Sequence, residues 1–355
     1  MTTSSNSQKR QLGVLNSDVI TLSHGSGGKA MRDLIEDVFV RAFDNEKLSH
    51  MEDQARIELS ELQAKGDRLA FTTDSYVIFP TFFPGGDIGK LAVSGTVNDL
   101  AVSGAKPLYM TCSMILEEGF PVADLRKIVQ SMKQTADRAG VAIVTGDTKV
   151  VEKGSADKVF INTAGIGVID SRFNVSSSNA QPGDLVIVNG TLGDHGAAVI
   201  AARQDLAFET NVLSDCAPLN LLIADMFEAC QDIHCLRDAT RGGVATILNE
   251  FVRDSKVGIK LAEKAISIRP EVRGICEILG LDPLYLANEG KIVSIVPPAY
   301  AGKIIDVMRR HEEGASCSII GEVVESASHM VTMETSFGGE RVVDMLVGDQ
   351  LPRIC

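Results

Sequence analysis

The chain carries the stretch Val141-Ala142-Ile143-Val144-Thr145-Gly146-Asp147, a short apolar run rich in β-branched residues that an aspartate closes. Such a run predicts a buried β-strand. It follows Leu125 to Ala139, where apolar residues recur at the spacing of an amphipathic helix. Leu69 to Asp74 is a second apolar run closed by an aspartate, and Val159 to Ile169 is a third expected strand. Helices and strands therefore interleave, which predicts an α/β or α+β fold.

The same interleaving continues beyond residues 176–184, a polar, turn-forming segment that marks the best candidate for a domain boundary. Apolar strands are expected beyond it at Leu185 to Val188 and at Ile292 to Val296. Two glycine-rich turns in this half precede helices. We therefore expect a loosely ordered polar leader over residues 1–20, an N-terminal domain over 21–175, a C-terminal α/β domain over 176–335 and a tail over 336–355.

Composition narrows the class of protein. A length of 355 residues suits two domains that each bury a core. The formal net charge of −13 argues against binding nucleic acid, which needs a positive field. Because the chain has no apolar run of about 18 residues, we expect no membrane span. Residues 1–10 are polar and unlike a signal peptide. The seven cysteines form no CxxC pair, so we expect the protein to be located in a reducing cytoplasm.

The last residue, Cys355, differs from the other cysteines because it lies outside any apolar or helical context. It is not a prenylation site, since that motif needs three residues after the cysteine. Chain ends are usually exposed, and a thiolate is a strong nucleophile at neutral pH. The residues alone leave two interpretations open: an incidental cysteine, or a tethered nucleophile that carries a small group between active sites.

Four aspartates follow an apolar strand or turn and precede a small or apolar residue: Asp74, Asp99 (after Asn98), Asp147 and Asp238. Each alone is typical of a turn or a helix cap. Carboxylates at strand ends are also the ligands with which Mg²⁺ is held against substrate phosphates. Four such positions beside two glycine-rich loops favour a metal–phosphate site over four unrelated caps.

Three further features are candidates for the same chemistry. The segment His24-Gly25-Ser26-Gly27-Gly28-Lys29 is not a P-loop, because its lysine comes too early and is followed by alanine. Its backbone N–H groups could still approach an anion at a helix start, although a flexible lead-in to the helix fits equally. Lys149 and Glu289 lie beside apolar strands, where burial could tune a proton-transferring group, but each also fits a solvated charge.

Longer blocks of sequence resemble a known superfamily. The segments 83–92, 95–101, 145–149 and 237–243 are similar to the ATP-binding superfamily of aminoimidazole ribonucleotide synthetase, which includes selenophosphate synthetase and thiamine-monophosphate kinase. Within it, the segments 24–29 and 288–291 and the terminal Pro352-Arg353-Ile354-Cys355 resemble the carbamoyl dehydratases of nickel–iron hydrogenase maturation. The likeness runs from about residue 20 to residue 355.

The resemblance implies a homodimer in which the N-terminal domains pair strands into a shared β-barrel and the α/β C-terminal domains lie outside. It places ATP in the cleft between the domains. It also implies roles for particular residues. The metal ligands would be Asp74, Asp99, Asp147 and Asp238; the nucleotide would contact these residues together with His24, Gly25, Ser26, Gly27, Gly28 and Asn98; Lys149 and Glu289 would assist the chemistry at Cys355.

The implied activity is the ATP-dependent dehydration of an S-carbamoyl group on Cys355 to an S-cyanide. A carbamoyltransferase would load Cys355 from carbamoyl phosphate, and an iron-carrying maturation scaffold would accept the cyanide. Two alternatives stay open. One is a small-molecule synthetase or kinase of the same superfamily, although selenophosphate synthetases carry a reactive cysteine near the glycine-rich loop and the first cysteine here is Cys112. The other is a non-catalytic maturation scaffold.

Overall fold

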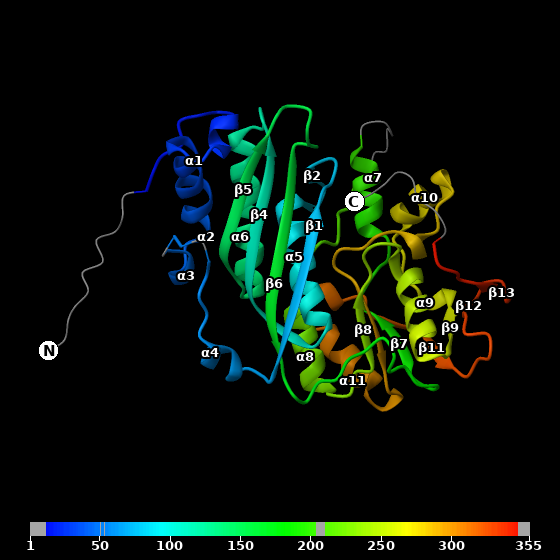
Figure 1. Ribbon diagram of the computed structural model, residues 1–355. Helices are drawn as coiled ribbons and strands as arrows, with labels where there is room; N and C mark the ends of the chain where they lie inside the picture. The colour runs from blue at the N-terminus through cyan, green and yellow to red at the C-terminus, as the bar shows by residue number, and fades with distance from the viewer. Residues whose placement is uncertain (1–11, 50, 53, 204–209, 347–355) are drawn as a thin grey trace.

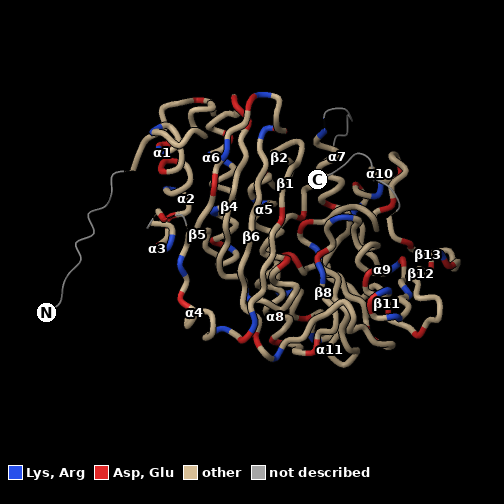
Figure 2. The backbone as a smooth tube through the Cα atoms, in the orientation of Figure 1, with Lys and Arg blue, Asp and Glu red and all other residues tan. Residues whose placement is uncertain are grey.

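The computed structural model of the protein describes residues 12–49, 51–52, 54–203 and 210–346. Cys355 and the last residues of the expected tail lie outside the described residues, as does the first half of the expected leader. Two β-sheets, each covered by helices, form the two halves of the molecule and lie side by side (Figure 1). Asp and Glu outnumber Lys and Arg, 47 to 34, and Figure 2 shows both kinds of charge interspersed over both halves.

The N-terminal sheet has four strands in the order β1 (Arg68–Tyr76), β6 (Val159–Ile169), β4 (Ala105–Glu117) and β5 (Ala142–Val151). Strands β4 and β5 are parallel and are joined by α6 (Val122–Ala139), whereas the other pairs are antiparallel. The short strands β2 (Phe82–Phe83) and β3 (Gly86–Asp87) form a separate ribbon before α5 (Ile88–Val102). Helix α5 begins where it does because the Asp87 carboxylate accepts hydrogen bonds from the free N–H groups of Gly89 and Lys90.

Helices α5 and α6 cover only one face of the N-terminal sheet (Figure 1). On β1 the alternate side chains point away from α5, and Phe71 is 71% exposed. Ile115 of β4 is also exposed. An antiparallel sheet normally carries polar side chains on a solvated face. The exposed apolar residues therefore mark this face as a surface that a single chain leaves uncovered, and the outer strands β1 and β5 pair with no further strand in the described ranges.

The segment before this sheet is more ordered than the sequence predicted. The carboxylates of Glu36 and Asp37 accept hydrogen bonds from the backbone N–H groups of Gly13 and Leu15, and Ile20 is completely buried. The expectation of a loosely ordered leader was therefore wrong for residues 12–20, because Leu15 and Ile20 pack on the core and the backbone is hydrogen-bonded to the N-terminal half. A helical stretch follows, made of α1 (Lys29–Leu34), a π-helical turn (Ile35–Val40) and α2 (Arg41–Phe43); α3 (Glu46–Ser49) and α4 (Leu59–Gln63) come next.

The C-terminal sheet has seven strands in the order β13 (Glu340–Val342), β12 (Val331–Glu334), β9 (Gly258–Ala262), β11 (Ser318–Val324), β7 (Leu185–Val188), β10 (Ile292–Val296) and β8 (Cys235–Asp238). Only the pair of β12 and β9 is parallel. Alternate strand residues face opposite sides, as the strand period requires. One side packs on α9 (Gly243–Ser255), and the other packs on α8 (Asn220–Ala229) and α11 (Pro298–Met308).

The two halves share core packing, which fixes the junction between them. Side chains of α7 (Asp194–Ala202) and α10 (Pro270–Leu279) lie in the same buried cluster as the start of α5. The end of α5 packs instead into the cluster beneath α8 and α11. Helix α5 therefore contacts the C-terminal half at both of its ends, and a site beside it is built on packed elements.

The strands predicted at 159–169, 185–188 and 292–296 are confirmed, and the predicted mixture of helices and strands in two halves is confirmed as well. Two details were wrong. Asp147 does not close its strand, since β5 continues to Val151, and Asp74 lies within β1. Strand length cannot be deduced from an apolar run when the strand continues as an alternating, half-exposed segment. No helix in the described ranges is long and apolar enough to cross a membrane.

Candidate active site at the junction of the two halves

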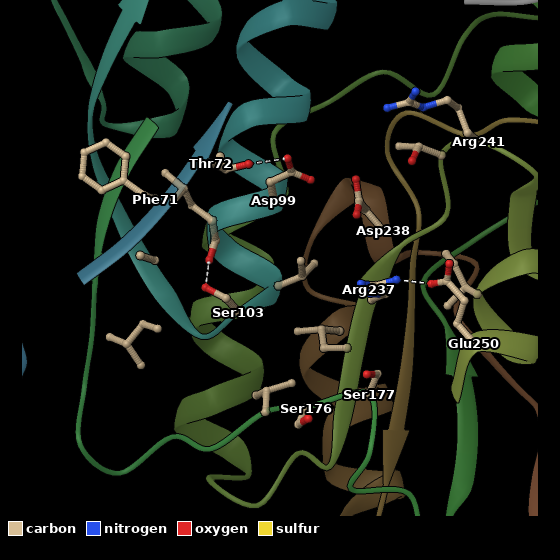
Figure 3. A pocket seen from close by; sticks show the side chains of 18 of the residues that line it. Phe71, Thr72, Asp99, Ser103, Ser176, Ser177, Arg237, Asp238, Arg241 and Glu250 are labelled. Atoms are coloured by element: carbon tan, nitrogen blue, oxygen red, sulfur yellow. Dashed lines mark hydrogen bonds and ion pairs between the residues drawn. The ribbon is translucent and has the colours of Figure 1, made fainter. Parts of the chain in front are cut away.

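A cavity of about 530 Å³ lies where β1 and α5 of the N-terminal half face β8 and α9 of the C-terminal half. Figure 3 shows Asp99 of α5 and Asp238 of β8 projecting into the space between these elements. At the opposite end the lining includes Ser103, Ser176 and Ser177. The cavity thus has an acidic end and an end lined by hydroxyl groups.

The acidic end is held by a few specific contacts. Thr72 Oγ1 donates a hydrogen bond of 2.8 Å to Asp99 Oδ2. The backbone N–H of Ser75 donates to Asp74 Oδ1, and an Arg241 guanidinium nitrogen lies 3.9 Å from the same oxygen. Asp238 lies at the end of β8, the edge strand of the C-terminal sheet. Carboxylates from two halves of the chain therefore face one cavity.

Burial first, and then mutual repulsion, raises the pKa values of these carboxylates. Burial raises the pKa of Asp99, and the charge of Asp74 raises it further against the hydrogen bond from Thr72. Burial also raises the pKa of Asp238 to about 7, with the charge of Asp99 as the next cause. Carboxylates that are costly to ionise together become favourable partners for a divalent cation.

The donor set fits Mg²⁺ bound together with a phosphate. Within the described ranges, no three acidic, histidine or cysteine side chains converge closely enough to hold a metal ion by themselves. Mg²⁺ usually takes one or two carboxylates and completes its octahedron with water and substrate phosphate oxygens. Asp99 and Asp238 have the chemistry for that arrangement, with Asp74 nearby.

Glu289 lies close to this acidic group and is 6% exposed. Burial raises its pKa well above the usual range, and the charges of Asp215, Asp238, Asp74 and Asp99 add to the effect. Among the described residues, none donates a hydrogen bond to its carboxylate or forms an ion pair with it. A titratable residue in a buried position with a strongly shifted pKa is typical of a group that takes part in chemistry.

Asn98 does not line the cavity, in contrast to the nucleotide-binding role that the sequence suggested. It is 2% exposed. Its Nδ2 donates to the carbonyl of Ala217, and its Oδ1 accepts from the N–H of Leu219. Both ends of the amide are therefore bonded to the backbone behind the cavity, and the nucleotide contact expected of Asn98 stays a prediction.

We expect Asn98→Ala to lower the free energy of unfolding by about 2–4 kcal/mol, because a buried carbonyl and a buried N–H would each lose a partner. Urea denaturation measures this change, and Asn174→Ala, at an exposed position, is the matched control. If the variant is as stable as the native chain but binds ATP more weakly, Asn98 contacts the nucleotide.

The remaining predicted residues lie together elsewhere. Lys149 Nζ is 3.6 Å from Asp147 Oδ2 on β5, and both side chains are more than half exposed. Strand β5 is the edge opposite β1, so about 14 Å of sheet, three strand spacings, separates this pair from the strand of Asp74. The structure thus divides the predicted site into two groups.

The glycine-rich segment belongs to the β5 group. A side chain at Gly25 would come within 2.9 Å of the Val150 backbone nitrogen, so glycine is needed for this close approach. The buried His24 accepts a hydrogen bond at Nδ1 from the backbone N–H of Thr21, which fixes the turn. Gly27 and Gly28 continue to the start of α1, where Gly28 is the N-cap residue and Ser26 is exposed.

Three residues of the junction were not anticipated from the sequence. Thr72 hydrogen-bonds Asp99, Arg241 approaches Asp74, and Asp215 contacts the segment that carries Glu289. Arg241 lies in a sequence block that carried the resemblance, so a signal for it existed. Thr72 and Asp215 had none, since only the folded chain shows which carboxylate or loop they contact.

Comparisons with known proteins agree with this architecture. Residues 51–169 and 181–334 match the N-terminal and C-terminal domains of the family described as AIR synthase related protein. The carbamoyl dehydratase HypE of Rhodobacter capsulatus is 54% identical over 341 residues, which cover 96% of this chain and 99% of the relative.

Solved structures are similar over the same extent. A crystal structure of the hydrogenase maturation protein HypE in complex with ATP has a TM-score of 0.89 and 47% identity, covering 94% of this chain and 99% of that chain. A chain in a crystal structure of a HypE–HypF complex has a TM-score of 0.76 and 52% identity, covering 88% and 99%.

The two matched domains and the two sheets with a cavity at their junction define an AIR synthase-related protein. At 54% identity over nearly the whole of both chains, the chain belongs to the carbamoyl dehydratase HypE family. The resemblance stated from the sequence blocks is confirmed.

Proposed function

We propose that this chain is an ATP-dependent carbamoyl dehydratase, which converts an S-carbamoyl group on its own Cys355 into an S-cyanide for the iron of nickel–iron hydrogenases. The observation that carries the proposal is Glu289, a buried residue whose carboxyl has no hydrogen-bond partner among the described residues and interacts electrostatically with Asp238 and Asp99. It offers a proton acceptor beside a place suited to phosphate, in a chain of the HypE family.

The reaction balances without a redox partner. The oxygen of the S-carboxamide attacks the γ-phosphorus of ATP, and ADP leaves. The nitrogen then gives up both of its protons in turn while the C–O bond to phosphate breaks. The products are the S-cyanide, ADP, phosphate and protons, so the net change on the cysteine is the loss of one water.

The acidic groups divide between two tasks. Asp99 and Asp238 would hold Mg²⁺, with Asp74 nearby, and bound Mg²⁺ would offset the charge of the phosphates. Glu289 would accept a proton from the carboxamide nitrogen, for which its carboxylate must be ionised. Burial raises the pKa of Glu289 most, and the charges of Asp238, Asp74 and Asp99 add to it, so neutralising those charges favours the ionised form.

We infer that a homodimer completes the site. The uncovered apolar face of the N-terminal sheet and its outer strands, β1 and β5, suit pairing with a second copy. If two copies close a barrel with β5 of one beside β1 of the other, Asp147, Lys149 and the glycine-rich segment approach the Asp74 of the second chain. Lys149 would then be able to orient the carboxamide oxygen or a phosphate.

The partners follow from the same chemistry. A counterpart of HypF would be the carbamoyltransferase that loads Cys355 from carbamoyl phosphate, because a HypE chain similar to this one forms a complex with HypF. An iron-carrying maturation scaffold would accept the cyanide. All six cysteines among the described residues are free and buried, which suits the reducing cytoplasm that we propose as the location.

Intact-protein mass spectrometry tests the proposal. The full-length chain is loaded by the carbamoyltransferase, separated from it, and then incubated with ATP and Mg²⁺. We expect the loaded species to become lighter by one water only when ATP is present, and Cys355→Ala to take up no carbamoyl group. Loaded protein that keeps its mass under these conditions would contradict the proposal, and turnover of a free small molecule by Cys355→Ala would favour a synthetase or kinase instead.

A further inference from the structure

Asp215 is a buried carboxylate that contacts the loop carrying Glu289 through three hydrogen bonds. Its side chain is 4% exposed. Asp215 Oδ1 accepts from the N–H of Glu289 at 3.1 Å, and Oδ2 accepts from the N–H of Gly290 at 3.2 Å and from Lys291 Nζ at 2.9 Å. Hydrogen bonds to an ionised acceptor are about twice as strong as neutral ones. The loop is therefore held by a residue 74 positions away in the sequence.

The segment that carries Asp215, Val212–Leu219, is itself fixed to both halves of the molecule; we call it the strap. The N–H of Ser214 donates to the carbonyl of Pro84 at 2.8 Å. At its other end Asn98 of α5 binds the backbone of Ala217 and Leu219. The strap thus links the N-terminal helix α5, which carries Asp99, to the loop of Glu289.

The strap and the loop are also in close backbone contact. The N–H of Ala217 donates to the carbonyl of Glu289 at 3.3 Å. A Cβ at Gly290 would lie 1.9 Å from the carbonyl oxygen of Asp215, so any other residue there would separate the two segments. On the far side of the loop, Asn288 accepts from Gly193 N–H and donates to the carbonyl of Ala239, the residue after Asp238.

We propose that Asp215 is the positioning residue for Glu289, setting the location of its carboxylate relative to Asp99 and Asp238 through the backbone of the loop. The inference rests on the proposed function. Since no described residue forms a hydrogen bond or an ion pair with the Glu289 carboxylate, the hydrogen-bonded backbone of its loop is the specific contact that fixes where the carboxylate lies. Burial alone would raise the pKa of Asp215, but Lys291, His195 and the loop N–H groups outweigh burial and lower it. The Asp215 carboxylate therefore stays ionised.

A purely structural role is the alternative, because Asp215 also neutralises the buried Lys291. Removing Asp215 alone would leave that ammonium without its partner and endanger the fold. The test therefore pairs Asp215→Asn with Lys291→Met, which removes both charges and keeps the side chains of similar size. The matched control removes the exposed ion pair on α6 with Lys133→Met and Asp137→Asn.

The measurement is the ATP-driven loss of water from the carbamoylated full-length protein. We expect the double variant to fold, to bind ATP within about twofold of the native Kd, and to dehydrate about 10- to 100-fold more slowly, which is the usual effect of misplacing a catalytic group by about 1 Å. The α6 control should match the native rate. In a Glu289→Gln background, the same pair of changes should alter the residual rate less than about twofold, because the group that Asp215 positions is gone.

A folded double variant that dehydrates at the native rate would overturn the inference and leave the proposed function standing. If the double variant lowers the dehydration rate by the same factor with and without Glu289, the inference is also overturned, since Asp215 would then act through the fold. Should the double variant not fold, the single variant Asp215→Glu, which keeps a carboxylate for Lys291 but displaces the acceptor oxygens from the loop, is measured with and without Glu289→Gln and must show the same dependence on Glu289. If the native loaded protein itself fails to lose water, the proposed function fails and the inference with it.

Discussion

Glu289→Gln should lower the rate of ATP-dependent dehydration by about 10²–10⁴-fold, the usual contribution of a positioned proton acceptor. The amide keeps the shape of the side chain but cannot accept the nitrogen proton. Loading of Cys355 and binding of ATP should be unchanged, since neither requires that proton transfer. Single-turnover mass spectrometry of the loaded protein gives the rate directly.

The pH dependence separates this explanation from a loss of stability. Because burial and neighbouring carboxylates raise the pKa of Glu289, the native rate should increase as the pH rises through that pKa, and the Gln variant should lose this dependence. Removing a buried ionisable group should leave the thermal midpoint unchanged or higher. Glu271→Gln, at an exposed position in α10, is the control. Native-like dehydration by Glu289→Gln would exclude it as the proton acceptor.

The sequence could predict the strands and helices because their periodicity is local. It could also group Asp74, Asp99 and Asp238, because each lies in a block with a recognisable pattern. It could not show that Asp147 and Lys149 lie at the opposite edge of the sheet from Asp74. That separation follows from the strand order β1-β6-β4-β5, which depends on long-range pairing.

Asn98 shows a second limit of sequence reasoning. Its place beside Asp99 suggested a shared role, but successive residues of a helix point in directions about 100° apart. Asp99 therefore faces the cavity while Asn98 faces the strap. Asp215 is the converse case, because nothing in its local sequence marks it, and its contacts depend on the packing of a loop 74 residues away.

Asp238→Asn should have opposite effects on activity and on stability. The dehydration rate should fall by about 10²–10³-fold, comparable to the loss of one group that stabilises transition-state charge. In the absence of divalent metal the variant should be more stable than the native chain, because an amide avoids the cost of burying a charge at this position and also removes the repulsion from Asp99. Functional sites commonly trade stability for chemistry in this way.

The stability difference should depend on pH with a definite sign. The folded pKa of Asp238 is raised to about 7, against about 3.9 in an unfolded chain. The folded state therefore binds the proton more tightly, and native stability falls as the pH rises from about 4 to about 7. Urea denaturation with EDTA should show that the free energy of unfolding of the variant exceeds that of the native chain by roughly 2–4 kcal/mol at pH 8. This difference should decrease towards pH 4.

With Mg²⁺ and ATP at pH 8, the native chain should become more stable than the variant. Its carboxylates then bind a cation that the variant binds less tightly. Asp157→Asn, at an exposed position outside the cavity, should follow the native chain under every condition. A variant that is less stable than the native chain without metal would show that Asp238 is held by favourable contacts, and would argue against the repulsive carboxylate group as the metal site.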